Sequence, residues 1–285
     1  MSTDQPPVAL CNYCGLRPAG SHEHLPGVAA LNDTPVTVRF LRPSRGGFQH
    51  VERVEPEGFV VRTICRQCNQ RTGGSYGAAF KEFALQFAAS GALAAGHQRA
   101  WISLREIQPL RVLKQIAAMV LAAQANLSLT RWSELRQFVL RRDQRLASAE
   151  RRFYLYRNTS SIGRITSFTG MAFLRVSPPL APMFFSEISW PPLGIVCSLG
   201  RHPLLERMKD ITAWGQYAFR SRDSFGFSVP QLSVEANWPL AFGSEAEADR
   251  WIERLGVATT VQSATEVDAP TQLSALIRRH RAPSA

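Results

Sequence analysis

Four of the five cysteines occur as two C-x-x-C pairs, Cys11 with Cys14 and Cys65 with Cys68. Two intervening residues let one short turn present both sulfurs to a single ion, and two such turns supply the four ligands of a tetrahedral zinc site. Residues 15–64 separate the pairs, so further structure must be inserted between the two turns. The spacing therefore predicts a structural Zn²⁺ that joins two distant stretches of chain.

Two C-x-x-C pairs are also found around iron–sulfur clusters and as separate redox-active pairs. No thioredoxin-like pattern surrounds either pair here, which favours zinc. The fifth cysteine, Cys197, lies in the apolar run GIVCSLG, which is typical of a small buried side chain.

The composition is that of a folded protein with one large domain or two ordinary ones: 285 residues, 45% hydrophobic and 19% charged. No apolar run approaches the roughly 18 residues of a membrane helix, so we expect no membrane partner. The start, MSTDQPPVALC, lacks the basic and apolar regions of a secretory signal, which favours a cytoplasmic location.

The net charge of +11 favours contact with phosphate backbones, and nucleic acid, DNA in the first place, is the expected partner. The excess lies in residues 91–160, which hold twelve basic and four acidic residues. Only three of the 33 basic residues are lysines. The planar fork of arginine suits phosphate, although a GC-rich genome would give the same bias.

The pattern along the chain predicts an α+β protein in three parts: a tail (1–10), a zinc-bound module (11–95) and an α+β C-terminal domain (96–285). Within the module, TPVTVRFL (34–41) has the character of a strand, and GGFQHVERV with GFVVRTIC that of a hairpin. The run TGGSYG predicts a break before a helix over 78–93.

In the C-terminal domain, residues 100–150 are expected to be helical, 152–243 rich in strands, and 244–256 a capped helix. The second of the expected middle helices, RWSELRQFVLRRDQRLASAERR, would place Arg141, Arg145 and Arg152 on one face. That face is either a phosphate-contacting stripe or an ordinary solvated surface.

Residues beside the cysteines add a further pattern. SHEHLPG (21–27) follows the first pair, and Asn69 directly follows Cys68 in ICRQCNQRTGG. Together, C-x-x-C-G, the Glu-His pair before a proline, and C-x-x-C-N before glycines resemble the HNH endonuclease family. The resemblance covers about residues 11–85 and implies a zinc-stabilised treble-clef (ββα-metal) core.

The resemblance implies phosphodiester hydrolysis with one divalent metal. His24 would be the general base that deprotonates the attacking water, a role to which histidine is suited as a residue type. Glu23 and Asn69 match positions that bind the catalytic Mg²⁺ or Mn²⁺ through oxygen. His22 is a further candidate ligand. The zinc would hold the module together and take no part in the reaction.

The sequence departs from the family pattern at two points. Members often carry an Asn about five residues before the second C-x-x-C, which orients the base, and here Val60 stands there. The following helix offers no further His or Asp for the metal, and the candidates are Ser75, Tyr76 and Glu82. His22 or His50 is the expected substitute ligand.

Each of these residues also has a simpler interpretation. Glu23 and His24 are ordinary surface residues beside a zinc turn in that interpretation, and Asn69 bonds nearby backbone. Arg66 and Arg71, which flank the second pair, either contact phosphate or are merely solvated. Two functions therefore remain: an HNH-like endonuclease, or a catalytically degenerate zinc module that binds nucleic acid or protein.

Overall fold

The computed structural model describes residues 9–28, 32–44, 47–90, 97–124, 132–147, 150–173, 183–233, 257–260 and 264–268. It is a mixture of helices and strands, as expected for an α+β protein. The strands form a small two-stranded sheet and a sheet of eleven strands. Among the described residues, no helix has the length and hydrophobicity needed to cross a membrane.

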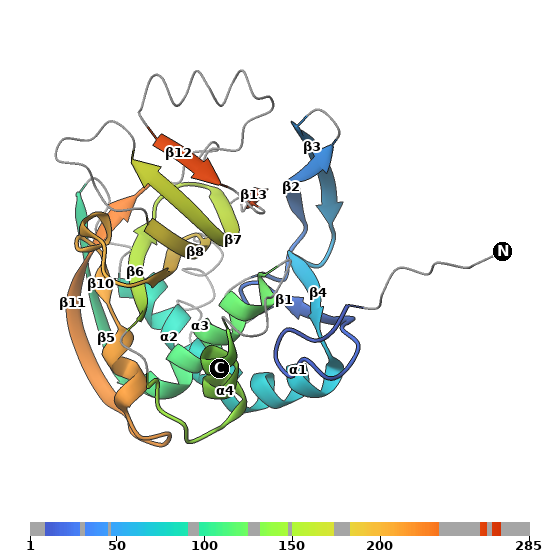
Figure 1. The fold of residues 1–285 in the computed structure, drawn as a ribbon. Helices are drawn as coiled ribbons and strands as arrows, with labels where there is room; N and C mark the ends of the chain where they lie inside the picture. The colour runs from blue at the N-terminus through green and yellow to red at the C-terminus, as the bar shows by residue number, and fades with distance from the viewer. Residues whose placement is uncertain are drawn as a thin grey trace, which may run out of the picture.

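The small sheet pairs β1 (Ser21–His24) antiparallel with β4 (Val60–Ile64). Helix α1 (Arg66–Thr72) begins directly after Cys65 and packs against β1. In Figure 1 these three elements lie together below the β2–β3 hairpin. The second cysteine pair therefore sits where β4 passes into α1.

The break predicted at TGGSYG was wrong. A π-helical turn (Gly73–Gly77) links α1 to α2 (Ala78–Ser90), so the chain stays helical over residues 66–90. The ring of Tyr76 is buried in this turn, and its hydroxyl donates to the carbonyl oxygen of Val139 at 2.7 Å. This tertiary anchor outweighs the weak helix propensity of the glycines.

Strands β2 (Val36–Ser44) and β3 (Gly47–Glu55) form a hairpin inserted between β1 and β4. The predicted pairing of β3 with β4 was wrong, since β4 pairs with β1 and β3 pairs with β2. The other edge of β2 pairs with β13 (Ala264–Asp268), near the C-terminal end of the chain. The insertion thus belongs to the large sheet.

The order of the large sheet is β3-β2-β13-β7-β8-β9-β6-β11-β5, with β10 beside β6 and β12 beside β7. All pairs are antiparallel except the short parallel contact of β11 with β6. The remaining strands are β5 (Arg99–Ile107), β6 (Arg151–Asn158), β7 (Ile162–Phe173), β8 (Met183–Trp190), β9 (Leu193–Leu199), β10 (Lys209–Asp210), β11 (Asp223–Leu232) and β12 (Val257–Thr260).

The expectation of helix throughout residues 100–150 was only partly right. Helices α3 (Pro109–Ala122) and α4 (Ser133–Leu140) lie there, but residues 99–107 form strand β5. Burial alternates along most of β5, because Ala100, Ile102 and Leu104 face the core between exposed neighbours. That period of two is the signature of a half-buried strand.

The predicted arginine stripe does not exist as one helical face. Helix α4 ends at Leu140, whereas Arg141 and Arg145 follow it and Arg152 lies in β6. No apolar residue occurs between Leu140 and Leu146, so a longer helix would have no apolar side to bury there.

Helix α3 is the centre of the core, and thirteen of its residues are buried. One continuous hydrophobic cluster contains α3, the cysteines of both pairs, and residues of α2, α4 and the large sheet. The strand-rich character predicted for residues 152–243 is seen as far as residue 233. The predicted helix at 244–256 lies outside the described residues.

Candidate metal centre

The four cysteines of the two C-x-x-C pairs come together at one point. The sulfur atoms of Cys11, Cys14, Cys65 and Cys68 all lie within 4.8 Å of one another, and those of Cys14 and Cys65 are 4.0 Å apart. Zinc–sulfur bonds of about 2.3 Å place the sulfurs of a tetrahedral site a little under 4 Å apart. The donor set and its spacing therefore fit the predicted structural zinc.

The thiols of this cluster influence one another. A hydrogen bond from Cys68 lowers the pKa of the Cys11 thiol to about 4, and the same bond raises the pKa of Cys68. The Cys68 thiol thus helps to hold negative charge on Cys11 and itself keeps its proton. A cation at the centre would stabilise all four thiolates, because metal binding displaces thiol protons.

The first cysteine turn is fixed to the end of α3. The side-chain amide of Asn12 donates to the carbonyl oxygens of Leu121 and Gln124, each at 2.9 Å. The hydroxyl of Tyr13 donates to the carbonyl oxygen of Ala118 at 2.9 Å. Leu121 is one of the last four residues of α3, whose carbonyls lack a partner within the helix, so Asn12 caps this end and Tyr13 adds a second bond one turn earlier.

The turn also requires glycine after Cys14. Gly15 has a φ of 66°, and a Cβ atom there would lie 2.4 Å from Nη2 of Arg136. Arg136, on α4, approaches because its Nε donates to the carbonyl oxygen of Tyr13 at 2.7 Å. The positive φ disfavours a residue with a side chain here, and such a residue would also displace the guanidinium of Arg136.

The imidazole of His24 is positioned by the loop that follows it. Its Nδ1 lies 3.1 Å from the carbonyl oxygen of Asn32. The ring is half-buried, and the bond at Nδ1 fixes the ring orientation and leaves Nε2 as the acceptor when the imidazole is neutral. This is the arrangement that a general base needs.

Asn32 holds that loop through its own side chain, and sequence reasoning missed it. Its amide nitrogen donates to the carbonyl oxygens of Pro26 and Phe59, at 2.9 and 2.8 Å, and its amide oxygen accepts from the Phe59 amide at 2.7 Å. Asn32 is fully buried. It thus links the chain before the inserted hairpin to the chain just after it.

A contact of Asn32 lies beside Val60, the position where the family resemblance led us to expect an asparagine. The amide expected shortly before the second cysteine pair is absent there, but Asn32 reaches the neighbouring Phe59 from the other side of the insertion. The only sequence signal was an asparagine a few residues after His24, in LNDTP. Nothing local shows that it is buried.

Glu23 is buried beside the first cysteine turn. Only 8% of the residue is exposed, and this burial raises the pKa of its carboxyl to about 7. Its charge in turn helps to raise the pKa of the buried Tyr13, after the larger effect of burial. Because successive strand residues face opposite sides, Glu23 and His24 project from opposite faces of the β1–β4 pair.

Asn69 ties α1 to β1. Its amide nitrogen donates to the Ser21 hydroxyl at 3.0 Å and to the carbonyl oxygen of His22 at 2.6 Å. These bonds use the nitrogen and leave the amide oxygen available as a metal ligand. The His22 side chain is exposed.

The other candidate ligands are engaged elsewhere. The Tyr76 hydroxyl donates to the Val139 carbonyl of α4, and Glu82 forms an ion pair with Arg222 at 3.2 Å. For Ser75 the structure shows a bond of the backbone carbonyl alone, which accepts from Arg111 at 2.7 Å. The side chain of His50, on β3, lies outside what the structure describes. Within the described part of the chain, the four cysteines are the only group of three or more His, Cys, Asp and Glu residues close enough to hold an ion.

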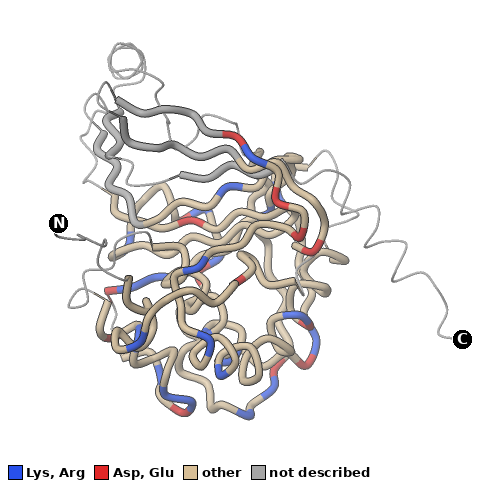
Figure 2. The backbone as a smooth tube through the Cα atoms, turned by 90° about the vertical axis from the view of Figure 1, so that its right-hand side faces the viewer, with Lys and Arg blue, Asp and Glu red and all other residues tan. Residues whose placement is uncertain are grey.

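Basic residues surround the module without forming the predicted stripe. Arg66 and Arg71 are exposed on α1, and Arg141 and Arg145 are exposed after α4. Figure 2 shows blue segments at intervals along the lower half of the molecule, with red segments among them. A second grouping lies nearby, where the guanidinium carbons of Arg111 and Arg142 lie 5.3 and 4.3 Å from the ring centroid of Phe219.

No protein-family model, curated protein or solved structure matches the chain.

Proposed function

We propose that the chain is an HNH-like, metal-dependent endonuclease that hydrolyses phosphodiester bonds in nucleic acid, DNA in the first place. The observation that carries the proposal is the bond between His24 Nδ1 and the Asn32 carbonyl, held by a fully buried amide. A solvated surface histidine needs no such support. A general base needs such support, because it must keep one ring nitrogen directed at the attacking water.

The local architecture supports the same proposal. A cysteine turn, the β1–β4 pair and a helix that starts at the second cysteine pair are the elements that a treble clef would need. In this proposal zinc holds the parts together, and β1 carries Glu23 and His24 beside α1, which carries Asn69. The side-chain bonds of Asn69 to β1 keep the strand and the helix in register.

In the proposed reaction, Nε2 of His24 accepts a proton from water as the water oxygen attacks phosphorus. The bond from phosphorus to the leaving oxygen breaks, and solvent protonates the product alkoxide. The amide oxygen of Asn69 would hold Mg²⁺ or Mn²⁺, ions that accept one or two protein oxygens and fill the remaining sites with water and phosphate. The buried Glu23, on the face of β1 opposite His24, is not placed to share that ion with the base. Such an ion would supply charge stabilisation at the phosphate and the leaving oxygen.

The test is nicking of supercoiled plasmid by the purified chain with Mg²⁺ or Mn²⁺. We expect His24→Ala to lower the nicking rate by about 10²- to 10⁴-fold, the usual contribution of a general base. His97→Ala is the matched control, since it removes an exposed imidazole outside the metal module. Equal nicking by His24→Ala and wild type would exclude His24 as the base.

A second candidate function is a catalytically degenerate zinc module that binds nucleic acid through its basic surface. It is favoured by the engagement of Tyr76 and Glu82 away from β1. This alternative predicts a gel shift at low salt with no nicking under any metal. Arg71→Glu would then reduce the slope of binding against salt by about one unit. Absence of any shift at low salt would point instead to a protein partner.

A further inference from the structure

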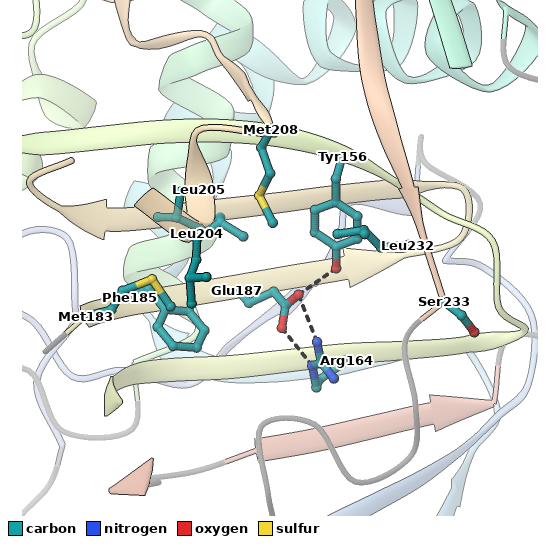
Figure 3. A pocket seen from close by; sticks show the side chains of 11 residues that line it. Tyr156, Arg164, Met183, Phe185, Glu187, Leu204, Leu205, Met208, Leu232 and Ser233 are labelled. Carbon is teal, nitrogen blue, oxygen red and sulfur yellow. Dashed lines mark hydrogen bonds and ion pairs between the residues drawn. The ribbon is translucent and has the colours of Figure 1, made fainter. Parts of the chain in front are cut away.

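A cavity of about 360 Å³ lies on the large sheet, away from the cysteines. Its floor is formed by β6, β7, β8 and β9, and residues 204–208 and 232–233 form its rim (Figure 3). Its apolar walls are Met183, Phe185, Val196, Leu205, Met208 and Leu232. This volume is within the range of small-molecule sites.

Three buried polar side chains meet at the floor of the cavity. Arg164 donates to both carboxylate oxygens of Glu187, from Nε at 2.7 Å and from Nη2 at 3.0 Å. The hydroxyl of Tyr156 donates to the same carboxylate at 2.5 Å. Figure 3 shows Arg164 and Tyr156 reaching Glu187 from opposite sides. All three residues are at most 4% exposed.

The position of the Tyr156 ring depends on a glycine in the neighbouring strand. A Cβ atom on Gly194 of β9 would lie 2.2 Å from the Tyr156 ring, so only glycine lets the ring lie against the strand. Burial of an ion pair is costly, and replacing such a pair with apolar residues often stabilises a protein. An ion pair kept at the floor of an apolar cavity therefore points to recognition of a ligand.

The charges at the floor of the cavity indicate the charge and the hydrogen-bonding groups of the ligand that it can bind. The guanidinium and the carboxylate neutralise each other, so the cavity offers no net charge to an ionic ligand. A charged molecule would lose its hydration against apolar walls without compensation. Glu187 accepts three hydrogen bonds, and a carboxylate has about four acceptor sites. One further donor can be accommodated.

The exposure of two leucines at the rim of the cavity supports an apolar ligand. Leu204 is 44% exposed and Leu232 is 37% exposed, although both line the cavity. Large apolar side chains gathered at the mouth of a cavity leave surface that a bound molecule would cover.

We propose that this cavity binds a small, neutral and largely apolar molecule that donates one hydrogen bond to the Tyr156–Glu187–Arg164 group. The site is separate from the metal module and does not depend on whether the module cuts nucleic acid.

The test uses two fluorescent probes with one skeleton, N-phenyl-1-naphthylamine and its sulfonated analogue 8-anilinonaphthalene-1-sulfonate. The neutral probe, which carries one N–H donor, should bind the full chain saturably at one equivalent. The sulfonate should bind at least about tenfold more weakly, a difference of about 1.4 kcal/mol. The high positive charge of the chain would favour the sulfonate at any non-specific surface, so the order of affinities is informative.

Leu204→Trp should narrow the mouth and weaken binding of the neutral probe by about tenfold. Because Leu204 is partly exposed, the fold should tolerate the change, and Leu232→Trp is a second variant of the same kind. Leu16→Trp, at a position that is 80% exposed beside the cysteines, is the matched control and should bind as wild type does. The proposal is overturned if the neutral probe does not saturate, if the sulfonate binds equally well, or if both rim variants bind like the control.

Discussion

The Nδ1 atom of His24 lies 3.1 Å from the carbonyl oxygen of Asn32, which is eight positions further along the chain. The Asn32 side chain also forms two hydrogen bonds with the backbone of Phe59, just after the inserted hairpin. The candidate base is thus supported by a loop that is locked at both ends. The first prediction tests that support.

Asn32→Ala should destabilise the chain and abolish any nicking activity. It removes three hydrogen bonds and leaves the Phe59 amide without its acceptor. A net loss of about 1 kcal/mol per bond, with a penalty for the orphaned amide, gives about 2–4 kcal/mol of unfolding free energy. Chemical denaturation measures the loss.

Asp33→Ala is the matched control for that experiment, because its neighbouring side chain is exposed. We expect a change in unfolding free energy within about 0.5 kcal/mol for the control. If Asn32→Ala were equally mild, the buried amide would not be what holds the loop.

Cys65→Ser should remove zinc and unfold the metal module. Binding of structural zinc supplies folding free energy, so loss of one thiolate should cost far more than one contact. Metal analysis of the purified chain should fall from about one zinc to a small fraction of one. Limited proteolysis should then cut within residues 11–90.

Cys197→Ala provides the comparison for zinc content, since Cys197 is a buried cysteine of β9 outside the cluster. It should keep one zinc per chain. Near-native protease resistance in Cys65→Ser would show that the cysteines do not fix the module.

Because Lys114 is buried, we expect the stability of the chain to depend on pH. Its side chain is fully buried and its Nζ donates to the carbonyl oxygens of Phe138 and Arg141, which end α4. Burial lowers the pKa of Lys114 from 10.5 to about 7. Between these values the unfolded chain binds one proton more at this site than the folded chain does. The unfolding free energy therefore rises with pH across this window.

The difference in unfolding free energy between wild type and Lys114→Met isolates that effect, because other groups titrate in both proteins. We expect wild type to gain stability relative to the variant from pH 7 to pH 9, and the difference to be flat below pH 6. A difference that stays constant over pH 6–9 would mean that the ammonium keeps its ordinary pKa.

The parts of the structure that were predicted correctly rest on local patterns. A C-x-x-C turn is specified by two residues between cysteines, so the pairing of Cys11, Cys14, Cys65 and Cys68 was foreseeable. The apolar stripe of α3 was equally visible, because its period of 3.6 residues matches the element that it forms.

The errors arose where distant contacts decide. The run TGGSYG stays helical because the Tyr76 hydroxyl donates a hydrogen bond to the Val139 carbonyl of α4. Strand β3 pairs with β2, and β4 pairs with β1 instead. Strand β5 is the exception, since its two-residue alternation is a local signal that adjoins the stronger helical pattern of α3.

The sequence by itself determined that four cysteines form one centre and that a Glu-His pair and an asparagine stand beside it. Only the tertiary structure decided that Asn32 holds His24, that the cysteine turn caps α3, and that Arg164, Glu187 and Tyr156 share a cavity. The reason is that turns and helices are specified within a few residues, whereas these contacts join strands and helices far apart in the chain. Their partners are chosen by packing and sheet pairing, which no local pattern records.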